Sequence, residues 1–284
     1  MGQSFYEADA DARAVFDEAS ELLGYDMKAL CFEENEKLNL TQYTQPAMVT
    51  TGIAIVKVVE KQGLLPDTAA GLSLGEYEAL YAAGALSVTD AIRVVARRGE
   101  LMEAAVPAGV GAMAAVLGAE ASLIEETLSE IPEVWIANYN CPGQIVISGK
   151  KEAVEAAAEA LKARGIKRVL MLNVSGPFHS GLLREAGEEL GKVLAETEIH
   201  PLRIPYYANV TGGIVEDAAE VRGLLTEQVY SSVRFEQSIR NMLSAGVDTF
   251  YELGPGKTLA GFVKKIDREA TVVNIETMED LAKI

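Results

Sequence analysis

The chain has 284 residues, of which 49% are apolar, enough for a sizeable buried core in one large domain with room for a smaller one. Its 25 basic and 42 acidic residues give a net charge of −17, which argues against a nucleic-acid partner because no dense patch of Lys and Arg is available to neutralise phosphates. The two cysteines, Cys31 and Cys141, are far apart and lack metal-binding spacing, so we expect no disulfide framework, no metal site and a cytoplasmic location.

The first third of the chain is predicted to be mostly helical. Apolar residues share one face over 8–23, and Gly24 provides a natural end for that helix. The longest uncharged run, 38–56, is interrupted by Asn, Gln, Thr and Pro, so it predicts a buried helix over 47–62 rather than a membrane span. The acidic N-terminus lacks the features of a signal peptide, and we expect no membrane partner. A short strand near 68–70 then leads into a glycine-serine turn.

The middle of the chain changes character, because short strand-like runs begin to alternate with helical ones. Before it, a helix is predicted through Tyr81, and another from a Ser87 cap to about Glu103. The elements predicted next are strand 111–118, helix 122–131, strand 134–140, strand 144–149, helix 150–164 and strand 166–174. This β-α-β-β-α-β order is the ferredoxin-like arrangement.

Helix and strand alternate again in the last third, with strands predicted near 204–210, 249–253 and 271–275. We therefore predict an α/β fold in two parts. A large subdomain with a parallel sheet comprises 1–107 and 176–284, and a ferredoxin-like small subdomain comprises 108–175. Proline-containing stretches mark both boundaries.

Residues 71–77, GLSLGEY, fit the pattern Gly-x-Ser-x-Gly, in which a strand runs directly into a helix and the serine Oγ is exposed at the bend. In this pattern Gly71 would let the chain turn tightly, and Gly75 would let the new helix approach without a clashing Cβ. Ser73 is therefore a candidate nucleophile. The same spacing also arises by chance in loops, so the rest of the chain has to decide.

A serine needs a base to take its proton, and the chain has only two histidines. His179 follows a predicted strand and precedes a helix, which is where α/β folds place functional loops. A half-buried histidine satisfied by the backbone is the alternative at this position. His200 precedes Pro201 at the end of a charged helix, where we expect a surface or capping role.

Arg98 lies on the apolar face of the helix that follows Ser87, whereas Arg93 and Arg97 point toward solvent. A guanidinium on a buried face needs an anionic partner, because an unpaired charge there is very costly. An internal salt bridge and a snorkelling side chain are two explanations. The third is a bidentate clamp for a substrate carboxylate, a task that suits arginine better than lysine.

The ordered motifs of the chain resemble those of the malonyl-CoA:acyl-carrier-protein transacylase family of fatty-acid synthesis. The matching segments, in order, are GLSLGEY (71–77), RRGELMEAAVPAGVGAMAAVLG (97–118), NYNCPGQIVISG (138–149), NVSGPFHS (173–180), YANVTG (207–212), TEQVYSSVRF (226–235) and ELGPGKTLAGF (252–262). Together they span nearly the whole chain and are far more specific than the serine turn alone. The resemblance implies an α/β-hydrolase-like large subdomain with a ferredoxin-like small one.

The resemblance also implies a mechanism. By position, Ser73 matches the nucleophile and His179 the general base, and the backbone N–H of Leu74 would contribute to the oxyanion hole. Malonyl-CoA would acylate the serine, and the phosphopantetheine thiol of acyl carrier protein would then take the malonyl group from the ester. The coenzyme A thioester is a substrate in this scheme, and no cofactor is implied.

Three further positions match the substrate-binding residues of the family. Arg98 would bind the malonyl carboxylate, and Gln228 would line the site near the histidine. Phe178 resembles family members that prefer malonyl over the bulkier methylmalonyl group. Because carrier proteins are acidic, docking would need a local basic patch. The candidates are Lys150, Lys151, Arg164, Lys167, Arg168, Lys264 and Lys265, and the alternative for each is an ordinary solvated side chain.

The start of the chain departs from the family pattern. The family normally opens with a strand and a Gly-Gln-Gly-x-Gln loop, whose last glutamine supplies the second oxyanion N–H. Residues 5–20 align just downstream of that loop, so we expect a truncated product that lacks the strand and this donor. Loss of one such donor costs roughly two to three orders of magnitude in turnover, so impaired activity is expected.

Two alternative functions remain open from the sequence. The first is a serine esterase or thioesterase that uses the same serine and histidine with water as the acceptor. The second is a truncated, inactive acyltransferase-like module that only binds partners.

Overall fold

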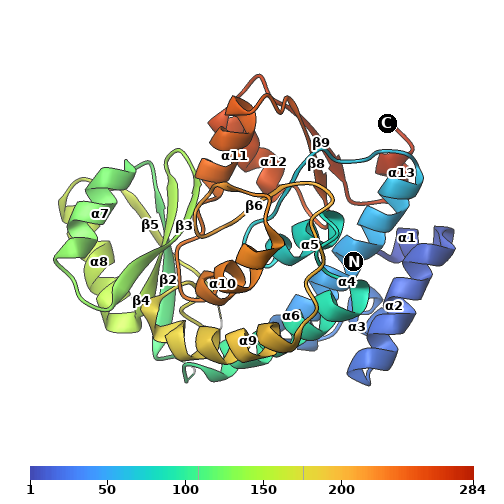
Figure 1. Ribbon diagram of the computed structural model, residues 1–284. Coiled ribbons are helices and arrows are strands. Elements are labelled where there is room, and N and C mark those ends of the chain that lie inside the picture. Colours follow the sequence, from blue (N-terminus) through green and yellow to red (C-terminus); the bar gives the residue numbers. More distant parts are fainter. Residues whose placement is uncertain (108, 175) are drawn as a thin grey trace.

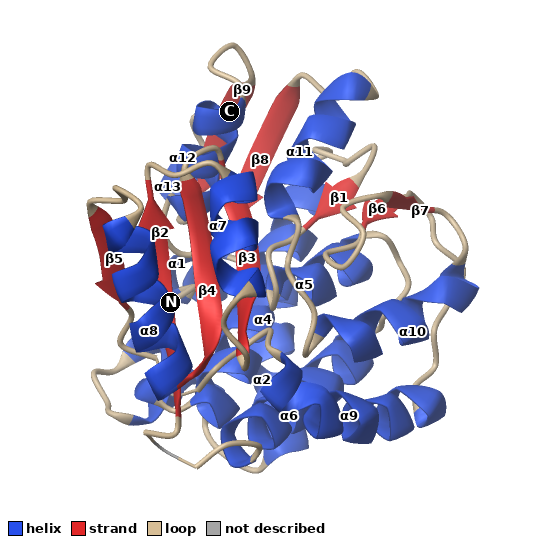
Figure 2. Ribbon diagram, turned by 90° about the vertical axis from the view of Figure 1, so that its left-hand side faces the viewer, coloured by secondary structure: helices blue, strands red, loops and turns tan. Residues whose placement is uncertain are grey.

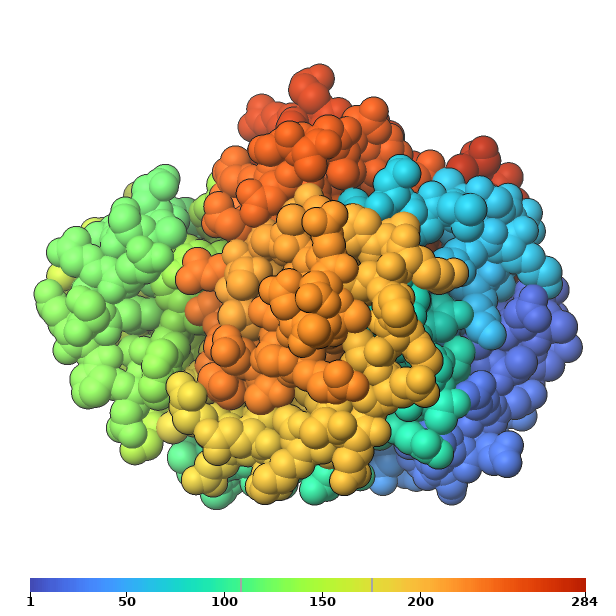
Figure 3. Space-filling view, viewed as in Figure 1, coloured from blue at the N-terminus to red at the C-terminus, as the bar shows by residue number. Residues whose placement is uncertain are grey.

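The computed structural model describes residues 1–107, 109–174 and 176–284 as a mixed α/β structure (Figure 1). Ala108 and Ser175, where the predicted subdomain boundaries fall, lie outside the described residues. Helices dominate the right of the view, and a sheet covered by helices lies at its left. In the space-filling view this green segment forms a separate lobe beside the yellow and orange C-terminal segments (Figure 3).

The N-terminal third is helical, as predicted. Its helices are α1 (Gln3–Ala8), α2 (Ala10–Leu23), α3 (Met27–Phe32), α4 (Thr41–Lys61), α5 (Gly75–Ala82) and α6 (Val88–Ala104). Gly24 ends α2 in the left-handed region, and the Ser87 side chain caps α6 by accepting the Asp90 N–H. Helix α4 begins six residues before the predicted start and contains Pro46, because its packing against α2 and α6 compensates for the one N–H that the proline lacks.

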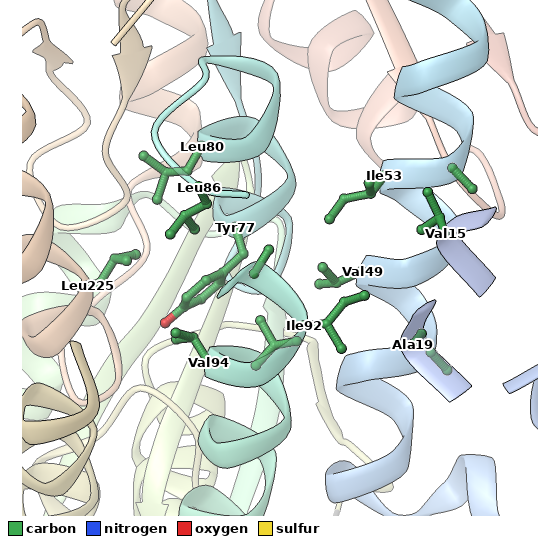
Figure 4. Close-up of a cluster of buried hydrophobic side chains, with 14 of the residues drawn as sticks. Val15, Ala19, Val49, Ile53, Tyr77, Leu80, Leu86, Ile92, Val94 and Leu225 are labelled. Carbon is green, nitrogen blue, oxygen red and sulfur yellow. The ribbon is translucent and has the colours of Figure 1, made fainter. Parts of the chain in front are cut away.

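The main core lies between these helices (Figure 4). Val15 on α2 lies beside α4, and Ile53 on α4 points toward Ile92 on α6 and Tyr77 on α5. All four side chains are fully buried. Because α5 packs into this core directly after the Gly-Ser-Gly turn, the turn is held on a rigid element rather than on a free loop.

The middle segment forms its own layer around a second core. Its elements are β2 (Gly111–Leu117), α7 (Ala121–Ser129), β3 (Val134–Cys141), β4 (Gln144–Lys150), α8 (Lys151–Ala163) and β5 (Arg168–Met171). The strands are antiparallel in the order β3-β4-β2-β5, and α7 and α8 cover one face of the sheet (Figure 2). The predicted β-α-β-β-α-β order is confirmed, and alternating apolar residues on the covered face explain the packing.

The rest of the chain holds two small sheets where one parallel sheet was predicted. Strand β1 (Ala69–Ala70) pairs in parallel with β6 (Tyr206–Tyr207), which pairs antiparallel with β7 (Ile214–Val215). Strands β8 (Thr249–Leu253) and β9 (Thr271–Ile275) form a separate parallel pair. Strands β1 and β8 are not hydrogen-bonded to each other, and a groove of about 580 Å³ lies between them. The single sheet predicted for this part of the chain is therefore divided into two.

Helices connect these strands or, in the case of the last one, follow them. They are α9 (Arg184–Glu196), α10 (Ala218–Gln228), α11 (Phe235–Ser244), α12 (Thr258–Ile266) and α13 (Met278–Leu281). Helices α11 and α12 bury a third apolar cluster against β8 and β9, and α9 and α10 pack against each other beside α6. None of the described helices is both long and apolar enough to cross a membrane.

Candidate active site

Ser73 lies at the bend between β1 and α5, as the Gly-x-Ser-x-Gly pattern predicts. Its φ of 53° places a non-glycine residue in the left-handed region. Asn209, which follows β6, holds the bend from both sides: its Oδ1 accepts the Ser73 N–H at 2.6 Å, and its Nδ2 donates to the Gly71 carbonyl at 2.6 Å. The buried amide therefore fixes the backbone on which the serine hydroxyl is presented.

The two glycines of the motif do not play the predicted parts. A Cβ on Gly71 would lie 2.0 Å from the carbonyl carbon and oxygen of Gly75, so it is the first glycine that permits the close approach. A Cβ on Gly75 would have no heavy atom within 4 Å, and the predicted role of this second glycine is wrong. The clash arises because the bend folds the start of α5 back onto the end of β1.

The structure brings Ser73 and His179 together. The serine Oγ lies 2.7 Å from His179 Nε2, and His179 Nδ1 lies 2.7 Å from the Gln228 carbonyl oxygen. Because a carbonyl can only accept, Nδ1 carries the hydrogen and Nε2 is free to accept the serine proton. His179 also has a positive φ, 56°, so both members of the pair are held on strained backbone.

The electrostatics keep this histidine neutral. His179 is 3% exposed, and burial together with the nearby Arg98 charge lowers its pKa from 6.5 to about 4. A neutral imidazole is the form that can act as a base. His200, by contrast, lies on the surface, 3.6 Å from Glu198, which confirms its predicted surface position.

Arg98 is the largest fully buried side chain of the described residues, at 2% exposure, and it points into the same site. One guanidinium nitrogen donates to Gln45 Oε1 at 2.7 Å; the other donates to Gln228 Oε1 at 3.0 Å and to Ser73 Oγ at 3.2 Å. All three acceptors are neutral, and Arg98 forms no ion pair within the described chain. Neither the predicted internal salt bridge nor a snorkelling side chain fits this position.

Leu74 and Phe178 occupy the other predicted positions. Leu74 is the N-cap of α5, and its N–H, one of the first-turn donors that a helix leaves free, bonds to no acceptor among the described residues. Phe178 is half-buried and packs against a small cluster of Met113, Ala137 and Val146, so it lies where the small sheet meets the large part of the fold.

Three buried polar residues of the site were missed from the sequence: Gln45, Glu76 and Asn209. Gln45 and Glu76 gave a usable signal, because each is a polar residue on the apolar face of a helix. Glu76 Oε2 accepts from Gln228 Nε2 at 2.7 Å and from the Asn209 N–H at 3.3 Å. Burial raises the pKa of Glu76 to about 7, although these donors and the Arg98 charge oppose the rise.

A pocket of about 360 Å³ leads to His179 from the surface, between the small sheet and α9. Arg184 and Arg234 line it, and each guanidinium lies over a tyrosine ring, 4.4 Å from the Tyr230 centroid and 5.3 Å from the Tyr139 centroid. The larger groove between β1 and β8 is lined by none of the predicted site residues, so the smaller pocket is the one joined to the chemistry.

Taken together, these groups have the chemistry that acyl transfer through a serine ester requires. The Ser73 hydroxyl is hydrogen-bonded to the neutral imidazole of His179. The free N–H of the next residue and the buried guanidinium of Arg98, which has no ion pair among the described residues, lie beside it. Such a site can form a covalent ester with a substrate that carries a free carboxylate. Clusters of three or more metal-ligating side chains are absent from the described residues.

Comparisons with known proteins agree with this chemistry. The family described as "Acyl transferase domain" matches residues 1–280. The malonyl CoA-acyl carrier protein transacylase of Bacillus subtilis is 46% identical over 99% of this chain and 90% of its own length. The solved acyl carrier protein S-malonyltransferase of Vibrio cholerae superposes with a TM-score of 0.97 at 40% identity, covering 100% of this chain and 94% of that one.

A third relative is a malonyl-transacylase solved in complex with a type II PKS acyl-carrier protein, with a TM-score of 0.96 and 38% identity over 100% of this chain and 93% of that one. The matches run through the full length of the chain and do not support the predicted truncation. On this evidence, the chain belongs to the malonyl CoA-acyl carrier protein transacylase family.

Proposed function

We propose that the protein transfers a malonyl group from coenzyme A to the phosphopantetheine thiol of acyl carrier protein through a malonyl ester on Ser73. The observation that carries this proposal is the buried guanidinium of Arg98, which bonds only neutral acceptors and lies 3.2 Å from the serine Oγ. An unpaired charge at this depth is costly until an anion meets it. A malonyl group supplies a carboxylate two carbon–carbon bonds from the carbonyl under attack, which suits that separation.

In the first step the Ser73 Oγ attacks the thioester carbonyl while His179 Nε2 takes the hydroxyl proton. The Leu74 N–H stabilises the oxyanion, the carbon–sulfur bond breaks, and coenzyme A leaves as a thiol with the proton from His179. In the second step the carrier-protein thiol gives its proton to His179 and attacks the ester. Ser73 regains its proton, and the malonyl group leaves as a new thioester. Gln228, through its carbonyl, keeps the imidazole in the required tautomer.

Arg98 would give the selectivity, because an acetyl group offers no carboxylate. Replacing Arg98 with Ala should lower kcat/KM for malonyl transfer at least about 30-fold more than for acetyl transfer, since truncating a buried charged pair costs 2–5 kcal/mol or more. Equal losses for both donors would contradict the assignment. We further propose that Phe178 narrows the acyl site against methylmalonyl, which a Phe178→Ala variant tests by comparing the two donors.

Intact-mass spectrometry tests the covalent step directly. The wild-type chain incubated with malonyl-CoA should carry a malonyl adduct that is absent from Ser73→Ala. If no adduct forms on the wild-type chain, the result supports the alternative of an inactive module that only binds partners. A chain that releases free malonate without loading carrier protein is a thioesterase.

The pantetheine arm would enter through the pocket beside His179. Arg184 and Arg234 form no ion pair among the described residues, whereas the earlier candidates Lys150 and Arg164 are held by glutamates. Guanidinium groups without an ion pair can bind the phosphate group that coenzyme A and the carrier-protein arm both carry. Arg184→Ala should raise KM for carrier protein several-fold, and Arg164→Ala, the control, should not. Equal KM values in both variants would refute this docking site.

The proposal includes the division of the chain. We place 1–107 and 176–284 in an α/β-hydrolase-like subdomain and 108–175 in a ferredoxin-like subdomain, supported by the separate apolar clusters of the two parts. A cytoplasmic location is part of the proposal too, supported by two free, buried cysteines.

A further inference from the structure

Gln228 forms hydrogen bonds with four residues of the site: Ser73, His179, Arg98 and Glu76. Its main-chain carbonyl holds His179 Nδ1, and its side-chain Oε1 accepts from Arg98 at 3.0 Å. Its side-chain nitrogen donates to the Ser73 carbonyl at 2.7 Å and to Glu76 Oε2 at 2.7 Å. The side chain is fully buried, so no solvent molecule competes for these four contacts.

The orientation of this amide decides what Arg98 meets. If the amide were turned over, its NH2 group would face the guanidinium, and two donors would oppose each other at hydrogen-bond distance. Glu76 Oε2 already accepts the Asn209 N–H, and a carbonyl can only accept, so Glu76 Oε2 and the Ser73 carbonyl both select the orientation that presents Oε1 to Arg98. The Ser73 carbonyl accepts one of the two hydrogens of the Gln228 amide, and Glu76 accepts the other.

We infer that Glu76 is a positioning residue: by fixing the Gln228 amide, it holds Arg98 in the orientation that recognises the free carboxylate of the acyl group. The inference rests on the proposed function, in which Arg98 binds that carboxylate. Glu76 touches neither the thioester nor the serine hydroxyl. Its own position is fixed by burial at the start of α5 and by the Asn209 N–H at 3.3 Å.

Glu76 carries both a charge and an acceptor oxygen, and two substitutions separate them. Glu76→Asp keeps the charge but withdraws the oxygen from Gln228 by one methylene. Glu76→Gln keeps an acceptor oxygen at the same reach and removes the charge. Glu78, two residues further along α5, forms no hydrogen bond to the site, so Glu78→Asp is the matched control.

The measurement is the ratio of kcat/KM for malonyl-CoA to that for acetyl-CoA. Glu76→Asp should lower this ratio about five- to tenfold, mainly through a higher KM for malonyl-CoA, because a net hydrogen bond is worth about 1 kcal/mol and a charged one more. Glu76→Gln and Glu78→Asp should leave the ratio within about twofold of wild type. A retained ratio in Glu76→Asp, or equal losses in Glu76→Asp and Glu76→Gln, would overturn the inference.

A second variant covers the case in which Glu76→Asp fails to fold. Glu76→Met is similar in length but has no acceptor oxygen, so on its own it should lower the malonyl preference. Gln228→Met removes the amide that Glu76 orients, so adding Glu76→Met to it should change the malonyl preference no further. A further drop in the double variant would show that Glu76 acts by another route. Failure of the proposed function is distinguishable, because the wild-type chain would then form no malonyl adduct on Ser73.

Discussion

A pH profile of serine acylation gives the sharpest test of the site. His179 is buried beside the Arg98 cation, and these two causes lower its pKa from 6.5 to about 4. A histidine base of ordinary pKa loses about tenfold of its neutral form between pH 7.5 and 5.5. With a pKa near 4, the neutral form of His179 stays above about 95% over that range. The rate of Ser73 acylation should therefore change less than about twofold.

The assay is rapid-quench acylation by malonyl-CoA in a single turnover, from pH 4.5 to 8. Glu76, which has a pKa of about 7, is the other group of the site that titrates nearby, so the Glu76→Gln variant is measured in parallel and should give the same flat profile. His200→Gln is the surface control. A half-maximal rate between pH 6 and 7 in Glu76→Gln would refute the reasoning, because the imidazole would then be solvated.

Two more predictions concern α5 and its turn. Burial alone raises the pKa of Glu78 from 4.5 to about 8, so its favourable contribution to folding is present at low pH and is lost as the pH rises through 8. Glu78→Gln should therefore raise the free energy of unfolding by roughly 2–3 kcal/mol at pH 8.5, after allowance for the partial exposure of Glu78, and hardly at pH 5. Urea unfolding at the two pH values measures this. An equal increase in the free energy of unfolding at both pH values would contradict the prediction. Gly71→Ala should yield no soluble, active protein, because the added Cβ would clash with the backbone of Gly75. Gly75→Ala should retain activity. A soluble, active Gly71→Ala variant would contradict the close approach of residues 71 and 75.

The parts of the fold that follow from local pattern could be predicted. The β-α-β-β-α-β segment, the Ser87 cap and the Gly24 stop depend on residues close in sequence, and the structure has them at nearly the predicted positions. The sheet of the large part could not be predicted, because β1 and β6 have two residues each and their pairing is set by packing. The same holds for the start of α4, where tertiary contacts outweigh Pro46.

The site divides in the same way. Ser73 and His179 lie within sequence motifs that follow predicted strands, and Arg98 is distinguished by its place on an apolar helix face. Asn209 carries no such mark: its side chain acts on residues more than 130 positions away, and only the pairing of β1 with β6 brings it there. Glu76 was within the quoted motif, but its function depends on Gln228, which comes from α10.

The left-handed backbone at Ser73 and His179 has a consequence for engineering this enzyme. Each non-glycine residue in that region costs roughly 1–2 kcal/mol, and glycine at either position would remove that cost together with one partner of the proposed proton transfer. Variants chosen only for heat resistance would therefore be drawn toward inactive sequences at these two positions. A library aimed at a more thermostable transacylase has to be selected on turnover at high temperature, with both positions held constant.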